Sequence, residues 1–402
     1  MGIDQQFVGA SHRLALITGC LDLGGTTTFL CNLGGELVRR GIPVRVFSFE
    51  RDNPLATDFS RLGVPVSAYD EHELIYEDRL LAILGELAEF KPTAVLANLS
   101  ATSFEVLRYM PAGVFRIGMA HSSHPGAYDL LQFYLGHVDV MAAVSMTIKK
   151  TLDGLPDFSA KVKYVPLGVP IPTEGSLPAK TFAAPLRILY LGRLDREHKR
   201  AHLLQPIFSQ LRESGIPFHL TIAGEGPERA ALEAQIKGSM KHMVSFAGKV
   251  PYSDVPSLLA AHDIFLLVSD SEGLPLSLVE AMGCGLVPVV SDLASGIGEL
   301  VDKTTGKLVS PENIGGYAEA IIGLDQNREG MRQLSAAARN RVLREFSVGA
   351  MTDRLLALFP ESPKAEAQWP GRWVPKAILA APSAWRYLSP IRFFRRLLRR
   401  LS

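Results

Sequence analysis

The chain has 402 residues, of which 47% are hydrophobic and 21% charged, a composition typical of a folded domain protein. No apolar run approaches the ~18 residues that span a bilayer, and the first residues lack a basic region followed by an apolar core, so we expect neither an integral membrane protein nor a secretory signal. Three scattered cysteines fit neither a disulfide framework nor a zinc site. They favour a reducing, cytoplasmic setting.

The first half of the chain alternates short apolar runs with segments of helical periodicity. A buried strand is predicted at residues 14–18, followed by a glycine-rich turn at 20–28 and a helix at 29–40 that Gly41 ends. Further strands are predicted at residues 44–48, 94–98, 115–119 and 140–144. Strands that are separated by helices imply a parallel, doubly wound sheet.

A second alternating set follows a proline-rich segment, which we interpret as a linker. Its strands are predicted at residues 186–190, 219–223, 244–247, 264–268 and 286–290. The length of the chain suits two domains. We therefore predict an α/β protein with two Rossmann-like, doubly wound parallel-sheet domains that face each other across a cleft. The predicted bounds are an N-terminal domain at 1–170, a linker at 171–185, a C-terminal domain at 186–360 and a basic tail at 361–402.

Two carboxylates, Glu272 and Glu280, follow the predicted strand at 264–268 with seven residues between them. Glu272 lies in a turn with Gly273, and Glu280 lies about one turn into a helix that begins near Leu276, roughly 6 Å along its axis. In open α/β sheets this carboxyl-end crevice binds ligands, and a helix N-terminus there favours phosphate. A phosphate-binding helix N-terminus between two carboxylates suits a ligand that carries hydroxyls as well as phosphates, such as a nucleotide-sugar.

Two basic residues, Arg193 and Lys199, follow the strand predicted at 186–190. They offer a guanidinium fork and a point charge to a diphosphate. The alternative is that both are ordinary solvated loop charges. No two aspartates in the chain are spaced as Asp-x-Asp, a common way to hold Mg²⁺ against a nucleotide-sugar. We therefore expect no metal and no cofactor, with these two side chains supplying the counter-charge.

Gly24, Gly25 and His121 also follow predicted strands of the first domain. The glycines would let the backbone approach a ligand, although tight turns often use glycine for geometry alone. Gly19 is too far from Gly24 for a dinucleotide fingerprint, so an NAD-type site is disfavoured. For His121, a structural and a catalytic role are about equally expected.

Taken together, these motifs resemble those of a retaining glycosyltransferase of the family 4 type, which has the two-domain B-type glycosyltransferase fold. The resemblance runs from about residue 14 to residue 359 and is most specific at the Glu272–Glu280 segment. It implies that residues 1–170 form the acceptor-side domain and residues 186–360 the nucleotide-sugar-binding domain. It also implies catalytic roles for Glu272, His121, Arg193 and Lys199. It also implies that the donor is bound by the diphosphate clamp of Arg193 and Lys199, by Glu280 at the ribose, and by Gly24, Gly25, Gly224, Gly273, Leu274 and Leu276. The chain departs from the family pattern at Arg200 and Ser295, where glycine is common, and these differences bear on which sugar or nucleotide fits.

Other functions stay open from sequence alone. A sugar-nucleotide 2-epimerase shares the fold and would act on the donor without an acceptor. A dehydrogenase shares the Rossmann units but would need the nucleotide fingerprint that is missing. A non-catalytic sugar-nucleotide-binding protein is disfavoured by the intact clamp and carboxylates.

The tail at 361–402 carries nine Lys/Arg, two Asp/Glu and all three tryptophans. Between residues 391 and 401 its apolar and arginine side chains fall on opposite faces of a helix. This pattern predicts contact with an anionic membrane surface, the alternative being that the helix docks on protein. We expect a cytoplasmic protein, peripheral on the inner face of the membrane, with a nucleotide-sugar donor and a glycan or lipid-linked acceptor as partners, and no nucleic acid.

Overall fold

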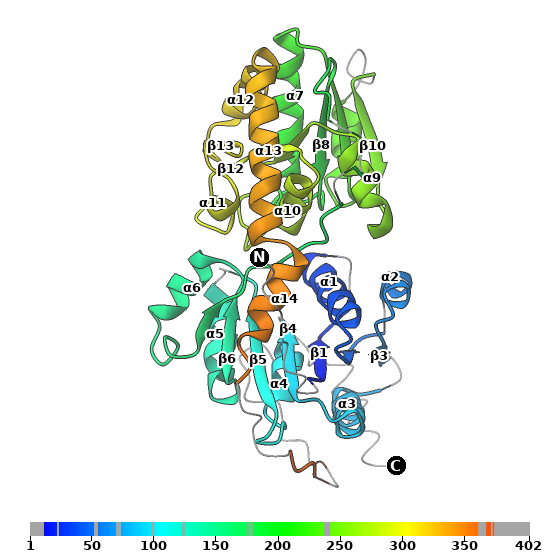
Figure 1. Ribbon diagram of the computed structural model, residues 1–402. Helices are drawn as coiled ribbons and strands as arrows, with labels where there is room; N and C mark the ends of the chain where they lie inside the picture. Colours follow the sequence, from blue (N-terminus) through cyan, green and yellow to red (C-terminus); the bar gives the residue numbers. More distant parts are fainter. Residues whose placement is uncertain are drawn as a thin grey trace.

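The computed structural model describes residues 12–360, apart from short gaps at 22–23, 52–54, 70–73, 99, 123–124, 174, 177, 179 and 237–241, together with residues 367–370 and 373. Within these residues the chain forms two α/β halves, each built on a parallel sheet (Figure 1). The predicted fold class is therefore confirmed. The amphipathic segment of the tail lies outside the described residues.

The N-terminal half holds a seven-stranded sheet in the order β3-β2-β1-β4-β5-β6-β7. Its strands are β1 (Leu14–Thr18), β2 (Val44–Ser48), β3 (Val66–Ala68), β4 (Ala94–Asn98), β5 (Phe115–Ala120), β6 (Val140–Ala143) and β7 (Val162–Tyr164). Its helices are α1 (Gly25–Arg39), α2 (Ala56–Arg61), α3 (Tyr76–Phe90), α4 (Ala101–Leu107), α5 (Pro125–Tyr134) and α6 (Met146–Asp153), with a 3-10 turn at Leu135–His137. Helix α1 begins four residues earlier than the periodicity predicted, directly after Gly24.

The C-terminal half holds a six-stranded sheet in the order β10-β9-β8-β11-β12-β13. Its strands are β8 (Leu186–Leu191), β9 (Phe218–Ala223), β10 (Val244–Gly248), β11 (Ile264–Leu267), β12 (Val287–Ser291) and β13 (Lys307–Val309). Its helices are α7 (Leu204–Glu213), α8 (Arg229–Gln235), α9 (Val255–Ala260), α10 (Leu276–Gly283), α11 (Ile297–Leu300), α12 (Ile314–Gln326) and α13 (Arg328–Glu345), with 3-10 turns at Ala201–Leu203 and Tyr252–Asp254.

The last described helix, α14 (Val348–Leu356), leaves the second half and packs on α1 of the first, as the orange helix in Figure 1 shows. Sequence analysis placed these residues in the second domain. The two chain crossings run side by side, because Val169 accepts from the Val348 N–H (2.9 Å) and donates to the Phe346 carbonyl (3.0 Å). A Cβ on Gly168 would lie 2.5 Å from the Ser347 carbonyl oxygen, so this close pairing requires glycine.

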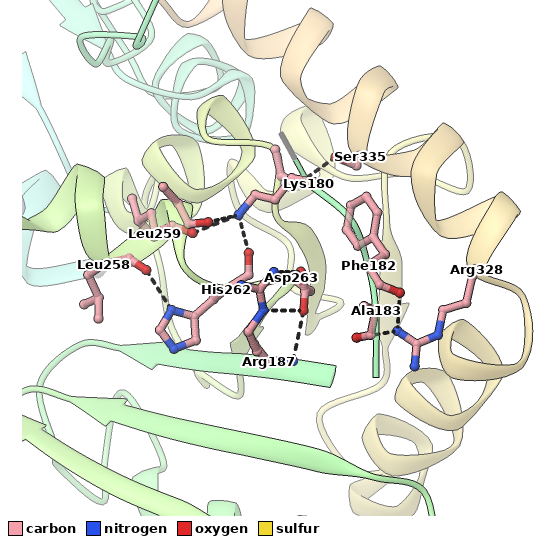
Figure 2. Close-up of polar contacts among 12 residues, drawn as sticks. Lys180, Phe182, Ala183, Arg187, Leu258, Leu259, His262, Asp263, Arg328 and Ser335 are labelled. Atoms are coloured by element: carbon pink, nitrogen blue, oxygen red, sulfur yellow. Dashed lines mark hydrogen bonds and ion pairs between the residues drawn. The ribbon is translucent and has the colours of Figure 1, made fainter. Parts of the chain in front are cut away.

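The end of the predicted linker is attached to the second half by polar contacts (Figure 2). The Lys180 ammonium donates to the carbonyls of Leu259 (3.0 Å), Ala260 (2.8 Å) and His262 at the C-terminal end of α9. Unpaired carbonyls at a helix C-terminus favour such a cation. Arg328 donates to the carbonyl of Phe182 (2.8 Å). These contacts fix where β8 begins.

The hydrophobic core continues from one half into the other. One buried cluster contains the first sheet, including Leu16 and Ile117, and also Leu276 and Leu278 of α10. A second cluster, with Tyr190 and Tyr317, lies on the other side of the second sheet. Because α10 contributes to the first cluster, the N-terminal end of this helix is held close to the first half.

Candidate functional site

The candidate site lies where the order of strands reverses in both sheets. In the first sheet the reversal falls between β1 and β4, and in the second between β8 and β11. Loops that leave such neighbouring parallel strands diverge at their carboxyl ends and form a crevice. Gly24 follows β1, Arg193 and Lys199 follow β8, and Glu272 follows β11. His121 follows β5, beside β4.

The loop after β8 is organised by Asp195, a residue that sequence analysis did not single out. Its carboxylate accepts from the backbone N–H groups of His198 and Lys199 (both 2.8 Å) and from Nε of Arg193 (2.6 Å). Burial alone would raise the pKa of Asp195, but these hydrogen bonds outweigh it and hold the pKa below its ordinary value. The Arg193 side chain is 62% exposed, so its guanidinium is paired but accessible to solvent.

Lys199 reaches from this loop to the turn after β11. Its ammonium lies 2.6 Å from a carboxylate oxygen of Glu272, and the two side chains are only 20% and 10% exposed. The backbone joins at the same place, because the Asp270 N–H donates to the His198 carbonyl (2.8 Å). The structure thus brings Lys199 and Glu272 into a partly buried ion pair at the crevice.

Glycines allow the loops around this pair to pack closely, backbone against backbone. Gly224 and Gly226 have φ values of 139° and 154°, which side chains rarely adopt. Cβ atoms there would lie 1.9 Å from the Gly192 carbonyl oxygen and 2.3 Å from that of Leu194. Gly224 therefore supports the Arg193 loop through the backbone. Its predicted contact with a donor stays a prediction.

The first half approaches the N-terminal end of α10 through backbone contacts. A Cβ on Gly273 would lie 2.2 Å from the carbonyl oxygen of His121, so the two backbones touch and only glycine fits. A Cβ on Gly25 would lie 3.9 Å from Leu276. The structure therefore gathers Gly25, His121, Gly273 and Leu276 at one place, with Leu274 buried next to Gly273. A helix N-terminus at that point carries partial positive charge.

His121 is buried with its imidazole edge against Phe29, the ring centroids being 5.3 Å apart. Burial lowers the pKa of His121 to about 4, so the ring is neutral at ordinary pH. Its Nε2 has no hydrogen-bond partner within the part of the chain that the structure describes. A buried ring nitrogen without a partner suits a hydrogen bond to a ligand.

Glu280 is half-buried on α10, and burial raises its pKa from 4.5 to about 8. It lines a cavity of about 550 Å³ between the halves, together with Asn32 of α1 and Tyr252. The Tyr252 hydroxyl donates to the Asn32 amide oxygen (2.5 Å) across the cleft. Burial is the only cause of this raised pKa, so no neighbouring cation among the described residues offsets it.

Two further properties of the described residues bear on the predictions. No cluster of three or more His, Cys, Asp or Glu side chains among them is arranged to hold a metal ion. None of their helices is both long and apolar enough to cross a membrane.

Comparisons with known proteins agree with this architecture. The family model described as "Glycosyl transferases group 1" matches residues 179–341, and that described as "Glycosyltransferase Family 4" matches residues 23–171. The chain belongs to the group 1 and family 4 glycosyltransferases. It is therefore an enzyme of the transferase class. The epimerase, dehydrogenase and non-catalytic alternatives are not favoured.

Relatives of this glycosyltransferase act in polysaccharide synthesis by their names. One from Escherichia coli, named as the colanic acid biosynthesis glycosyltransferase WcaL, is 28% identical over 69% of this chain and 73% of its own length. The amylovoran biosynthesis glycosyltransferase AmsK of Erwinia amylovora is 35% identical over 40% of this chain and 42% of its own length.

Solved structures share the fold of the glycosyltransferase. Anabaena HepE in complex with UDP has a TM-score of 0.70 at 18% identity, covering 86% of this chain and 98% of that one. A Staphylococcus aureus TarM variant in complex with Fondaparinux, alpha-GlcNAc-glycerol and UDP has a TM-score of 0.73 at 13% identity, covering 86% and 99%.

The raised pKa of Glu280 predicts a pH-dependent stability. Between about pH 5 and 8 the folded enzyme keeps a proton on Glu280 that the unfolded chain releases, so the free energy of unfolding falls as the pH rises. Glu280→Gln removes this proton exchange, and its stability relative to the native enzyme should therefore increase with pH. Urea unfolding at about pH 5.5, 6.5 and 7.5 measures the difference, with the exposed Glu312→Gln as control. Parallel curves for the native enzyme and Glu280→Gln would show that this carboxyl is not buried as described.

Proposed function

We propose that the enzyme transfers a sugar from a nucleotide-diphosphate-sugar to a glycan or lipid-linked acceptor, without a metal ion and with retention of anomeric configuration. The observation that carries the proposal is the Lys199–Glu272 pair, 2.6 Å apart at the crevice between the sheets. It puts a cation where a diphosphate would leave and a carboxylate where sugar hydroxyls would lie. The UDP complexes of HepE and TarM support a nucleotide-sugar donor, and the names of WcaL and AmsK support a polysaccharide product.

The proposed donor exchanges contacts with the groups that are now paired. Lys199 turns from Glu272 to the diphosphate, and Arg193 turns from Asp195 to the same group. Glu272 is then free to accept hydrogen bonds from hydroxyls of the transferred sugar, helped by the backbone N–H groups of Gly273 and Leu274. The two cations gain the diphosphate and Glu272 gains hydroxyls, while Asp195 keeps the backbone N–H groups of His198 and Lys199. The exchange therefore leaves each charged group with hydrogen-bond partners in the partly buried crevice.

The nucleoside end of the donor is assigned to Glu280. Its carboxyl lines the cavity between the halves and lacks a cationic partner in the described residues, so it is available to hydroxyls of the ribose. On the opposite side, Nε2 of His121 is the polar atom offered to the sugar by the first half. Gly24 and Gly25 permit that half to approach the donor.

Chemistry then proceeds as the bond between the sugar and the diphosphate breaks. Its electron pair stays on the phosphate oxygen, while positive charge develops on the ring in an oxocarbenium-like state. Arg193, Lys199 and the N-terminal end of α10 face the oxygen where negative charge grows, which lowers the barrier. With retention, the acceptor hydroxyl attacks from the face that the diphosphate leaves, and the departing phosphate oxygen takes its proton.

A thermal-shift panel of UDP-, GDP-, ADP- and dTDP-sugars should find at least one that stabilises the enzyme, since ligands that bind only the folded state raise its stability. With that donor, Arg193→Ala and Lys199→Ala should each lower turnover by roughly 10²-fold or more, because each removes a positive charge that would stabilise the departing diphosphate.

Chelation of divalent metals should leave turnover unchanged.

The matched control for both variants is Arg196→Ala, since Arg196 lies on the same loop and pairs with Glu228 outside the proposed clamp. Near-normal turnover in either clamp variant would defeat the diphosphate assignment. Stabilisation by none of the four sugars would count against a nucleotide-sugar donor altogether.

We also propose that the enzyme is cytoplasmic and peripheral on an anionic membrane surface, held by the basic tail, which would place it near a lipid-linked acceptor. Deletion of residues 384–402 should abolish binding to anionic vesicles in a flotation assay, because the arginine face supplies the attraction. Vesicles of zwitterionic lipid are the control. Unchanged binding to anionic vesicles after the deletion would favour docking of this segment on protein instead.

A further inference from the structure

Glu299 of α11 reaches out of the second half and contacts the first. One carboxylate oxygen accepts from the backbone N–H of Met146 (2.6 Å), the first residue of α6. The other accepts from the hydroxyl of Tyr164 (2.6 Å), which lies on β7. Nearby, the Thr147 hydroxyl donates to the carbonyl of Ser295 (3.4 Å). A single acidic side chain thus adds to the capping of a helix in the opposite half, whose own N-cap, Ser145, accepts from the Ile148 N–H.

This contact exists only while the two halves are together. The donors to Glu299 are Tyr164 and the N–H groups of Met146 and Thr147, and all of them belong to the first half. The free N–H groups and the dipole at the start of α6 favour a negative charge there. Glu299 is partly buried, and burial raises its pKa in spite of these hydrogen bonds. Separating the halves would expose it again and leave the N–H groups of Met146 and Thr147 without this acceptor, while Ser145 would still cap Ile148.

Glu299 is coupled to the sugar-facing turn through the backbone of its own half. The Gly296 N–H, just before α11, donates to the carbonyl of Gly273 (2.7 Å). A Cβ on Gly296 would lie 2.6 Å from a methyl carbon of Leu274, so α11 packs tightly behind this turn. Gly273 in turn touches the carbonyl of His121. A displacement of α11 by its contact with the first half would therefore also displace the turn that carries Glu272.

The cleft is bridged on its other flank by the Tyr252–Asn32 hydrogen bond. In Figure 1, α6 and α11 lie on one side of the junction and α1 and α9 on the other. The His121–Gly273 backbone contact is a further junction between the two halves. The Tyr252 bridge joins two neutral groups, whereas the Glu299 bridge sets a charge against a helix N-terminus, so the latter is the stronger of the two.

We propose that Glu299 is a positioning residue which holds the two halves closed and seats the 272–274 turn against His121. The proposal rests on the proposed function above. Substrates enter and leave when the Glu299 contact with α6 breaks, and the turn reaches its working position when the contact forms again. Nucleotide binding itself does not need the contact, because Arg193, Lys199 and Glu280 all belong to the second half.

Two variants test the contact from its two ends. Glu299→Gln keeps the size of the side chain but turns an amide NH₂ toward donors, and Tyr164→Phe removes one donor from the first half. We expect turnover to fall about 10- to 100-fold in Glu299→Gln and less in Tyr164→Phe. The affinity for free UDP, or for the diphosphate of the donor that the panel selects, should stay within about 2-fold of the native value. The exposed Glu312→Gln should change neither quantity.

A direct measurement of closure separates this proposal from the proposed function. Spin labels on cysteines at the exposed positions Lys163 and Lys303, with Cys20 replaced by Ser, report the distance between the halves. Glu299→Gln should shift the distance distribution toward longer values, and this holds even if no donor is turned over. An unchanged distribution together with unchanged turnover would overturn the proposal. The proposal would also be overturned if Glu299→Gln lowered both the nucleotide affinity and the melting temperature, since that result would mean that Glu299 only supports the fold.

Discussion

Pairing of charge in a partly dry crevice is the constraint on which the site depends. Lys199 and Glu272 lie 2.6 Å apart with little exposure, and removing one partner of such a pair costs up to about 3–5 kcal/mol when burial is complete. A ligand can therefore separate them only if it offers each a replacement. The proposed donor, a diphosphate joined to a sugar, would do so, because it presents anionic oxygens to the ammonium and hydroxyls to the carboxylate.

The architecture makes this pairing possible by bringing separate loops to one edge. Lys199 and Glu272 are 73 residues apart, but β8 and β11 are neighbours, so the loops that follow them meet. Gly224 and Gly226 bring the loop after β9 against the Arg193 loop from behind. Asp195 then fixes the loop and holds Arg193 at its surface. The loop that carries the proposed clamp is thus preorganised by backbone geometry, which would reduce the entropy lost on binding.

Much of the fold could be predicted from local patterns, because buried parallel strands are continuous apolar runs. Strands β3, β7 and β13 were missed; each is three residues long, too short for a periodic signal. The first turn of α1 was taken for loop, since Gly25 and three threonines are poor helix formers. The packing of α14 on the first half depends on contacts with α1 that no local pattern records.

The site was predictable as a set of residues after strands, but their pairings were not. The role of Asp195 had a local signal in the sequence. Its carboxylate lies three and four residues before the two backbone N–H groups that donate to it. Glu299 had none, because its partners Met146 and Tyr164 are 153 and 135 residues away. Charge at Glu272 and Lys199 was visible in the sequence, whereas their mutual neutralisation became visible only in three dimensions.

The exchange of partners at Lys199 is the central claim, and a crystal structure with a bound nucleotide-diphosphate-sugar tests it most directly. The account predicts that the Lys199 ammonium leaves Glu272 and lies within hydrogen-bond distance of the diphosphate, with Arg193 turned from Asp195 to the same group and Glu280 at the ribose. A nucleotide bound elsewhere, with the Lys199–Glu272 pair intact, would contradict it.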